Sequence, residues 1–440
     1  MARLFGTDGV RGVANRELTA ELVVRLGRAA GQVLVQGEAE HPLVLVGRDP
    51  RRSGEMIEAA IASGLCSAGM EVTLVGVVPT AAMAHLVRAR AARAAAMISA
   101  SHNPYEFNGI KFFSGDGFKL PDAVEDEIEQ ALGRHRALPV GEGVGRVRSD
   151  PAAVAAYEKH LVAQADCSLA GMRVVVDCAN GAASGLAVEV LGELGAEVIA
   201  LADGPDGANI NAGCGALFPE RMCQVTAEQG ADLGVALDGD ADRAIFSDER
   251  GNRVDGDQVL AIMAAQGSLS PRVVVGTVMS NLGLEQALAG MGCMLVRSKV
   301  GDRYVLEEMR RTGAILGGEP SGHTIFLDRE TTGDGLLTAI RLAGVMQRTG
   351  KRLSSLAGIM QRLPQALVNV PVPENGAWQD DRAIAAAIRE TERRLGRHGR
   401  LLVRASGTEP VIRIMVEHQD EAQVVAFAEE LAEVIRGRGR

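Results

Sequence analysis

The sequence is poor in aromatic residues, which make up only 3% of its 440 residues. Its hydrophobic cores must therefore be built from aliphatic side chains, and an apolar content of 47% is ample for several of them. None of the six cysteines forms a C-x-x-C pair, so neither a structural zinc site nor a disulfide framework is expected. This cysteine pattern instead predicts a protein of a reducing compartment. These cysteines are Cys66, Cys167, Cys178, Cys214, Cys223 and Cys293.

An excess of positive charge is also lacking, since 56 acidic residues outnumber 46 lysines and arginines and the formal net charge is −10 at pH 7. Proteins that bind nucleic acids or membrane surfaces generally need a basic face, so neither kind of partner is expected. No stretch approaches the roughly 18 apolar residues of a membrane helix. The N-terminal segment 1–8 lacks the apolar core of a signal peptide. These absences predict a cytoplasmic protein, and the length predicts about three domains.

A weak internal repeat is the clearest architectural feature of the chain. A short apolar strand, a helical stretch, a glycine and a second apolar strand follow one another in residues 44–75, 174–199 and 273–296. Short continuous apolar strands that alternate with helices are typical of parallel sheets covered on both faces. We therefore expect three related mixed α/β domains with mainly parallel sheets.

The C-terminal part of the chain has a different pattern. Residues 401–404 and 411–417 are expected to be two strands around a Ser-Gly turn, and a helix follows with Val424, Phe427, Leu431 and Val434 on one face. The Pro- and Gly-containing segment 371–376 is a candidate linker. We expect a smaller α+β domain here, and four domains around a central cleft, with boundaries at 1–155, 156–257, 258–367 and 368–440.

The first motif with chemical content is Ser99-Ala-Ser-His-Asn-Pro104, followed by Asn108-Gly-Ile-Lys111. Small neighbours leave the Ser101 hydroxyl accessible, and Asn-Pro favours a turn. A serine nucleophile needs a partner that manages protons, and His102 and Lys111 are candidates. An ordinary Ser/Asn turn that caps a helix is the alternative.

The second motif, Asp238-Gly-Asp-Ala-Asp-Arg243, places three carboxylates at alternate positions, on one side of an extended segment. Like charges so close repel one another unless a cation neutralises them, and oxygen ligands suit Mg²⁺ or Mn²⁺. An EF-hand loop ending at Glu249 has similar spacing. It requires Gly where Arg243 stands, and it requires flanking helices where the sequence predicts strands.

Three further segments contain groups that suit a phosphorylated sugar. Gly317-Gly-Glu-Pro-Ser-Gly-His323 offers Glu319, Ser321 and His323 on a Gly-rich turn. Arg404-Ala-Ser-Gly-Thr-Glu-Pro410, with Arg413 beyond it, combines guanidinium, hydroxyl and backbone donors that bind phosphate. The Gly-flanked loop 6–12 presents Arg11 in a similar way. Structural turns are the alternative interpretation of each.

Together and in this order, the motifs resemble those of the α-D-phosphohexomutase superfamily, and the match covers essentially the whole chain. Within it, the chain is most similar to the bacterial subfamily that acts on glucosamine phosphates, through residues 5–12, 109–113, 300–305 and 413–417. Two residues depart from that subfamily pattern. Phe107 stands where a polar residue is common, and Pro320 stands where glutamine is common. Pro320 leaves open the preference between amino and hydroxyl sugars.

The resemblance implies an enzyme that carries a phosphoryl group on Ser101 and moves it between O6 and O1 of a hexosamine phosphate through a 1,6-bisphosphate, supplying UDP-N-acetylglucosamine synthesis. It implies one Mg²⁺ per subunit, a cytoplasmic location and a homodimer. The implied metal ligands are Ser101, through its phosphate, Asp238, Asp240 and Asp242. The implied catalytic residues are Ser101, Lys111 with a depressed pKa, His102, Arg11 and Arg243. The implied substrate-binding residues are Glu319, Ser321, His323, Asp302, Arg404, Ser406, Gly407, Thr408 and Arg413.

Other functions remain open at this stage. A phosphomannomutase/phosphoglucomutase of the same superfamily would use the same motifs. A metal-dependent sugar phosphatase would use water in place of the sugar as acceptor. A sugar-phosphate binding protein without catalysis is a third class, and the intact Ser101, aspartates and Lys111 argue against it.

Overall fold

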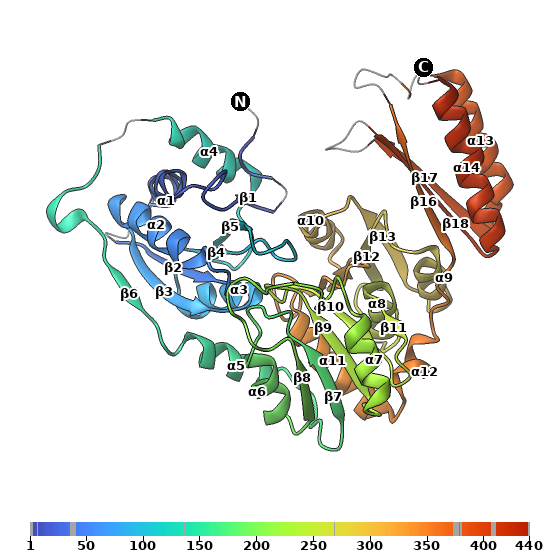
Figure 1. Cartoon of the computed structure of the whole chain (residues 1–440), viewed down its shortest axis with the longest axis horizontal. Coiled ribbons are helices and arrows are strands. Elements are labelled where there is room, and N and C mark those ends of the chain that lie inside the picture. The colour runs from blue at the N-terminus through green and yellow to red at the C-terminus, as the bar shows by residue number, and fades with distance from the viewer. Residues whose placement is uncertain are drawn as a thin grey trace.

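The computed structural model describes residues 3–6, 8–35, 41–134, 137–267, 269–372, 378, 381–405 and 411–438. These residues form three α/β units, each with a mixed parallel and antiparallel sheet, and a smaller unit with an antiparallel sheet (Figure 1). Within the same ranges, no helix combines the length and the hydrophobicity that crossing a membrane requires.

The N-terminal part of the chain forms a six-stranded sheet with helices around it. Its elements are β1 (Val10–Val13), α1 (Ala20–Leu34), β2 (Leu43–Arg48), α2 (Gly54–Ser67), β3 (Glu71–Val77), α3 (Thr80–Ala89), β4 (Ala94–Ile98), β5 (Phe107–Ser114), α4 (Asp122–Leu132), η1 (Gly141–Gly143) and β6 (Val147–Ser149). The strand order is β1-β5-β4-β2-β3-β6. The strands β4, β2, β3 and β6 are parallel, and β5 runs antiparallel to β1 and β4.

The second sheet has the order β11-β10-β9-β7-β8. Its part of the chain contains α5 (Ala153–Ala163), β7 (Arg173–Asp177), α6 (Leu186–Glu193), β8 (Glu197–Leu201), α7 (Glu220–Glu228), β9 (Leu233–Leu237), β10 (Ala244–Ser247) and β11 (Arg253–Val254). The central strand β7 is parallel to β8 and β9, while β10 turns back antiparallel beside β9.

The third sheet has the order β13-β12-β14-β15. Its part of the chain contains α8 (Gly256–Ala264), β12 (Val273–Thr277), α9 (Leu282–Gly290), β13 (Met294–Ser298), α10 (Asp302–Thr312), β14 (Leu316–Gly318), β15 (Thr324–Phe326), α11 (Gly335–Thr349) and α12 (Leu353–Ala357). Each of the three sheets contains a parallel pair joined through one helix, namely β2-α2-β3, β7-α6-β8 and β12-α9-β13. The internal repeat predicts this arrangement, and the structure confirms it.

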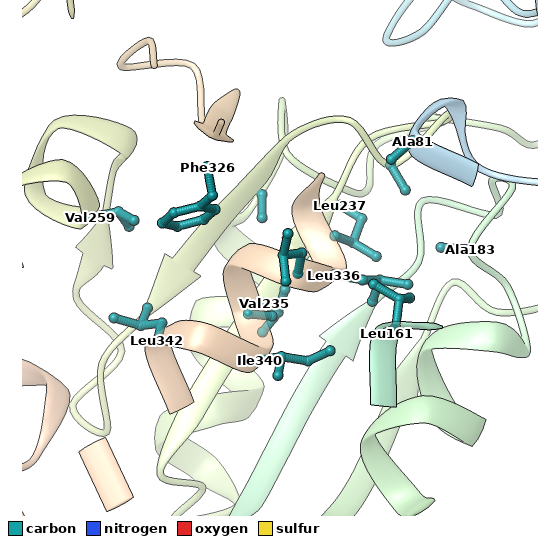
Figure 2. Packing of buried hydrophobic residues seen from close by; sticks show 14 of the residues in the cluster. Ala81, Leu161, Ala183, Val235, Leu237, Val259, Phe326, Leu336, Ile340 and Leu342 are labelled. Atoms are coloured by element: carbon teal, nitrogen blue, oxygen red, sulfur yellow. The ribbon is translucent and has the colours of Figure 1, made fainter. Parts of the chain in front are cut away.

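Apolar side chains on both faces of these sheets are buried, as expected for parallel strands. Val44 and Val46 of β2 belong to a core formed with α1 and α2, whereas Leu45 between them belongs to a second core. This second core continues through all three sheets. In Figure 2, Leu161 of α5, Leu237 of β9 and Leu336 of α11 converge in it. The three α/β units are therefore packed on one another through a shared core.

The C-terminal part forms a separate antiparallel sheet of order β16-β18-β17. Its elements are β16 (Gln365–Pro371), α13 (Arg382–Leu395), η3 (Gly396–His398), β17 (Gly399–Ala405), β18 (Val411–His418) and α14 (Glu421–Arg438). Both long helices pack on one face of this sheet, over a core of its own (Figure 1). The expected α+β arrangement is confirmed. In α14, Ile435 rather than the expected Val434 completes the buried stripe with Val424, Phe427 and Leu431.

Part of the expected linker belongs to this sheet. Pro371 pairs with Val411 at the end of β16, so it is a strand residue, and the rest of the predicted turn, from residue 373 to 376, lies outside the described residues. Proline is tolerated here because β16 is an edge strand. Since β16 begins at Gln365, it starts shortly before the predicted domain boundary at residue 368.

Candidate active site

Three loops that follow parallel strands carry most of the predicted site residues. Ser101 follows β4, Asp238 follows β9, and Glu319 follows β14. Ligands in α/β folds bind at the carboxyl ends of parallel strands, because the loops there converge. These loops meet in the structure, since Ser101 contacts Asp238 and His323 lies beside Asp242.

Ser101 is held in an unusual backbone conformation. Its φ angle is +50°, in the left-handed region, where a non-glycine residue costs roughly 1–3 kcal/mol. The buried hydroxyl donates a hydrogen bond to Oδ2 of Asp238 at 2.6 Å, and its Oγ also lies 3.3 Å from Nδ1 of His102. The strained serine therefore points directly at the aspartate loop.

A buried ion pair that the motif analysis missed supports this conformation. Arg51 bonds to Asp49 at 2.9 Å and donates to the carbonyl oxygens of Ser101 and Asn103, each at 2.8 Å. Asn211, in the loop between β8 and α7, donates to the same Ser101 carbonyl at 2.9 Å. The sequence does carry a signal for the ion pair, since Arg48-Asp-Pro-Arg51 puts charges directly after a buried strand.

The aspartate loop and the serine loop approach each other at backbone distance. A Cβ atom on Gly239 would lie 2.7 Å from the Ser101 carbonyl oxygen, so only glycine fits between the two loops. One carboxylate oxygen from each of Asp238, Asp240 and Asp242 lies within 4.8 Å of the other two, and all three residues are buried. Glu249, the last EF-hand position, instead accepts hydrogen bonds from Ser354.

The donor set of the three aspartates fits a hard divalent cation. Oδ1 of Asp240 and Oδ1 of Asp242 are buried without a hydrogen-bond partner. Burial, together with the charges of Asp242 and Asp240, raises the pKa of Asp238 to about 8. Carboxylates packed this closely destabilise one another unless a cation shares them, and oxygen-only ligands are those that Mg²⁺ prefers.

Lys111, on β5, lies against the same carboxylates. Its Nζ atom is 2.7 Å from Oδ2 of Asp240 and 3.7 Å from Oδ2 of Asp242. Burial alone would lower the pKa of Lys111, but the two carboxylates outweigh it and the pKa is raised. The depressed pKa implied by the family resemblance is therefore not found in this arrangement, because two negative charges face the ammonium group.

Two arginines and a histidine surround the serine and the aspartates. Nε of Arg11 and Nε of Arg243 are buried without a hydrogen-bond partner, and Nε of Arg243 lies 3.8 Å from Oδ1 of Asp242. An anion beside the serine could therefore accept a hydrogen bond from either N–H group. Burial and the positive charges of Arg243 and Arg11 lower the pKa of His102 to about 4. His102 is therefore neutral at pH 7, beside two guanidinium groups.

The third loop forms a tight turn at the end of β14. Glu319 Oε1 accepts the N–H of Gly301 at 2.9 Å, and the Ser321 hydroxyl lies 3.5 Å from Glu319 Oε2. His323 is buried, and its Nε2 accepts the N–H of Gly333 at 3.2 Å. Nδ1 of His323 then faces Asp242 at 3.6 Å. His323 thus supports the aspartate loop, while Glu319 and Ser321 remain together on the turn.

A lysine that the sequence analysis did not identify joins the first and third α/β units. Lys119 Nζ lies 2.5 Å from Oδ1 of Asp8 and 2.5 Å from Oδ2 of Asp302, at the start of α10. Although burial favours the neutral acid, the charge of Lys119 lowers the pKa of Asp302 well below its usual range. Asp302 therefore binds another part of the protein in this structure, and no single motif indicates Lys119.

The predicted phosphate residues of the C-terminal sheet are only partly described. Arg404 of β17 and Arg413 of β18 are directly opposite each other in the antiparallel pair, while Ser406, Gly407 and Thr408 lie outside the described residues. The sheet is anchored on the third α/β unit. Glu417 accepts the backbone N–H of Leu282 at 3.1 Å.

Comparison with known protein families identifies the same four units. Models of the phosphoglucomutase/phosphomannomutase domains match in order along the chain. Alpha/beta/alpha domain I matches residues 2–137, domain II residues 155–251, domain III residues 255–363, and the C-terminal domain residues 367–434.

Full-length relatives agree with this assignment. A curated protein named phosphoglucosamine mutase from Symbiobacterium thermophilum is 53% identical over 445 residues, which cover 99% of each chain. Another of that name, from Desulforudis audaxviator, is 51% identical over 442 residues, which cover 99% of this chain and 98% of the relative. The solved structure of a phosphoglucomutase/phosphomannomutase family protein from Burkholderia thailandensis superposes with a TM-score of 0.83 at 25% identity, covering 99% of this chain and 97% of that one. With its motifs, its four domains and its full-length relatives in agreement, the chain belongs to the phosphoglucomutase/phosphomannomutase family.

Proposed function

We propose that the chain is a phosphoglucosamine mutase, which interconverts glucosamine 6-phosphate and glucosamine 1-phosphate and so supplies UDP-N-acetylglucosamine synthesis. The main support for phosphoryl transfer is the position of the strained Ser101. Its hydroxyl lies 2.6 Å from Asp238, within a buried group of three aspartates. The full-length relatives of that name support the choice of substrate.

The proposal includes one Mg²⁺ per subunit, held by Asp238, Asp240, Asp242 and a phosphate oxygen on Ser101. The unpartnered buried oxygens of Asp240 and Asp242 support this assignment. When bound, Mg²⁺ would neutralise charge on the carboxylates and the phosphoryl group, which reduces repulsion of an attacking oxygen and lowers the pKa of Lys111.

In the first transfer, O1 of glucosamine 6-phosphate attacks the phosphorus on Ser101. The bond between phosphorus and Oγ breaks, and a bond from phosphorus to O1 forms. The O1 proton passes to a neutral Lys111, which hands a proton on to the departing Oγ, so Ser101 is left as a free hydroxyl and Lys111 is neutral again. The free N–H groups of Arg11 and Arg243 would hold the phosphoryl oxygens through charge-assisted hydrogen bonds. Positioning and charge stabilisation supply most of the catalysis in such transfers.

In the second transfer, the 1,6-bisphosphate has turned end for end. Ser101 Oγ gives its proton to Lys111 and attacks the phosphorus on O6, the bond between O6 and phosphorus breaks, and Lys111 delivers that proton to O6. Neutral His102, whose Nδ1 lies 3.3 Å from Oγ, can accept a hydrogen bond from the free serine hydroxyl between the two transfers. Glucosamine 1-phosphate is then released, and Ser101 is phosphorylated again.

The remaining predicted residues would bind the sugar and its other phosphate. Glu319 and Ser321 offer two acceptors and a donor for sugar hydroxyl groups on the turn after β14. Arg404 and Arg413, being cross-strand neighbours, would bind the phosphate that is not reacting, together with Ser406, Gly407 and Thr408. Asp302 and His323 would act by positioning the loops that carry these groups.

A panel of hexose 6-phosphates tests the substrate. We expect glucosamine 6-phosphate to have a higher kcat/KM than glucose and mannose 6-phosphates, because a site that hydrogen-bonds an amino group discriminates against its replacement. A clear preference for mannose or glucose 6-phosphate would instead indicate a phosphomannomutase/phosphoglucomutase. Release of inorganic phosphate without an isomer would indicate a phosphatase.

We also propose a location, an oligomeric state and domain boundaries for the enzyme. We place it in the cytoplasm as a homodimer, with domain boundaries at 1–155, 156–257, 258–367 and 368–440. Sedimentation of the purified protein tests the dimer, and cell fractionation tests the location. Limited proteolysis followed by mass measurement of the fragments tests the boundaries.

A further inference from the structure

A second group of metal-ligating side chains lies apart from the aspartate loop. It consists of His85 on α3, His160 on α5 and Glu330 in the turn after β15. Each side chain offers one ligand atom, and these atoms all lie within 4.8 Å of one another. Glu330 Oε1 is 2.5 Å from Nε2 of His160 and 3.8 Å from Nδ1 of His85. The three residues come from three distant parts of the chain.

The hydrogen bonding of this group is incomplete. Glu330 is fully buried, yet its Oε1 has no hydrogen-bond partner, and neither has Nε2 of His160. The two atoms nevertheless face each other at 2.5 Å, closer than an ordinary N–H···O hydrogen bond. A cation bound between the rings and the carboxylate would give both atoms a partner.

The other side of the carboxylate is already neutralised. Oε2 of Glu330 accepts a hydrogen bond from Arg88, which leaves Oε1 as the available ligand atom. Partners of this kind fix the orientation of a metal-binding carboxylate. The His85 and His160 rings stack with centroids 3.8 Å apart.

The site is open enough for an ion to enter. The side chains of His85 and His160 are 19% and 17% exposed, whereas Glu330 is at the base of the group with no exposure. In a tetrahedral zinc site with bonds of about 2.0–2.2 Å, ligand atoms are roughly 3.4 Å apart. The observed separations of 2.5 and 3.8 Å lie on either side of this value. Small side-chain rotations would therefore form the site.

We propose that His85, His160 and Glu330 bind a divalent transition-metal ion of the kind that prefers imidazole, represented by Zn²⁺, with water completing the coordination. Two histidines and one glutamate form an established zinc-binding set in proteins, while the all-carboxylate loop at residues 238–242 suits Mg²⁺. The chain thus has two chemically distinct metal sites.

A metal ion here would clamp the three α/β units together. The turn that contains Glu330 continues to Asp334, which accepts a hydrogen bond from Tyr157 of α5 at 2.5 Å. Beyond it, the N–H of Gly335 donates to the carbonyl of Ala241 in the aspartate loop at 2.9 Å. The ion would therefore join α3 and α5 to a segment that also supports the catalytic loop. Because it binds only the folded arrangement, it raises thermal stability.

The test uses the full-length protein, stripped of metal with a chelator and kept in excess Mg²⁺. Added Co²⁺ should give the intense visible absorption of a nitrogen-ligated, four-coordinate ion, and one equivalent of Zn²⁺ should abolish this absorption. Zn²⁺ should also raise the melting temperature. In His160→Gln and in His85→Gln, Co²⁺ and Zn²⁺ affinity should fall at least about tenfold. His398→Gln, at an exposed position, should bind as the wild type does.

Asp240→Asn separates the two sites, because it weakens the aspartate loop and leaves the histidines intact. This variant should keep the Co²⁺ absorption and the Zn²⁺-dependent rise in melting temperature. If Asp240→Asn removes them while both histidine variants keep them, Zn²⁺ binds the aspartates and the proposal is wrong. Absence of the visible absorption in the wild type would also overturn it. The metal-free melting temperatures of the two histidine variants show whether they are folded.

Discussion

Lys111 Nζ lies 2.7 Å from Oδ2 of Asp240, and the same oxygen accepts the hydroxyl of Thr80 at 2.5 Å. Lys111 and Thr80 belong to the first α/β unit and Asp240 to the second, and all three side chains are buried. Removing one member of a buried ion pair leaves an uncompensated charge, which typically costs about 3–5 kcal/mol. The pair therefore holds Lys111, the proposed proton-transfer group, and the carboxylates in one fixed arrangement.

Replacing the proposed nucleophile should stop catalysis without unfolding the protein. Ser101→Ala removes the hydroxyl that is proposed to carry the phosphoryl group, so activity should fall by at least about a thousandfold. The φ angle of +50° is held by Arg51 and Asn211 through the Ser101 carbonyl, which alanine retains. Intact-mass measurement should find one phosphate on the active wild type and none on the variant. Ser149→Ala, on an exposed edge strand, is the control; an active Ser101→Ala enzyme contradicts the mechanism.

Two acidic residues should respond differently when their charge is removed. Asp240→Asn loses one of three clustered carboxylates, so Mg²⁺ affinity should fall at least about tenfold and activity should need more Mg²⁺. Glu249→Gln should leave Mg²⁺ dependence unchanged, because Glu249 is bonded to Ser354. Titrating Mg²⁺ into chelator-treated enzyme while activity is measured compares the two variants. Equal losses, or activation by Ca²⁺ above Mg²⁺, would support the EF-hand interpretation.

The C-terminal arginines should affect retention of the bound 1,6-bisphosphate more than the phosphoryl-transfer step itself. Arg404→Ala removes one of two cross-strand guanidinium groups proposed to bind the distal phosphate. KM should rise, and the 1,6-bisphosphate should escape more often, which leaves Ser101 without phosphate. Activity should then decline with time and recover when a hexose 1,6-bisphosphate is added. Arg393→Ala, which only breaks an exposed ion pair with Glu390, is the matched control. Wild-type behaviour of Arg404→Ala in both assays would exclude Arg404 from the site.

A buried carboxyl near the junction with the C-terminal sheet should make stability fall with pH. Burial, followed by the charge of Asp255, raises the pKa of Asp257 from 3.8 to about 7. The folded state therefore holds this proton more tightly than the unfolded state. The stability that the neutral acid provides is complete below about pH 4, and it is lost as the pH rises towards 7.

Asp257→Asn should remove this pH dependence, because asparagine stays neutral and can still accept the N–H of Asn281. At about pH 8 the variant should be more stable than the wild type, by up to about 4 kcal/mol. At about pH 4 the two should be similar. Melting curves at both pH values measure the difference, with the half-exposed Asp328→Asn as control. A variant that is less stable at about pH 8 would show that Asp257 is ionised in the folded protein.

The sequence by itself determined the chemical groups of the site and their places along the chain. Ser101, Asp238 and Glu319 could be assigned to loops because each follows a short apolar run, and apolar runs of this length predict buried parallel strands. The repeat of strand, helix and strand predicted the three α/β units in the same way. These features are local, so they can be recognised from neighbouring residues alone.

Only the tertiary structure decided which distant side chains meet and what charge each one carries. Lys119 contacts Asp8 and Asp302 because three separate segments converge, and no periodicity of the sequence encodes that meeting. His85, His160 and Glu330 were likewise unrecognisable as a group until α3 and α5 were packed beside the turn after β15. The pKa of Lys111 is raised, against expectation, because Asp240 and Asp242 lie against it. Electrostatic interactions depend on distance in space, and folding sets that distance independently of separation along the chain.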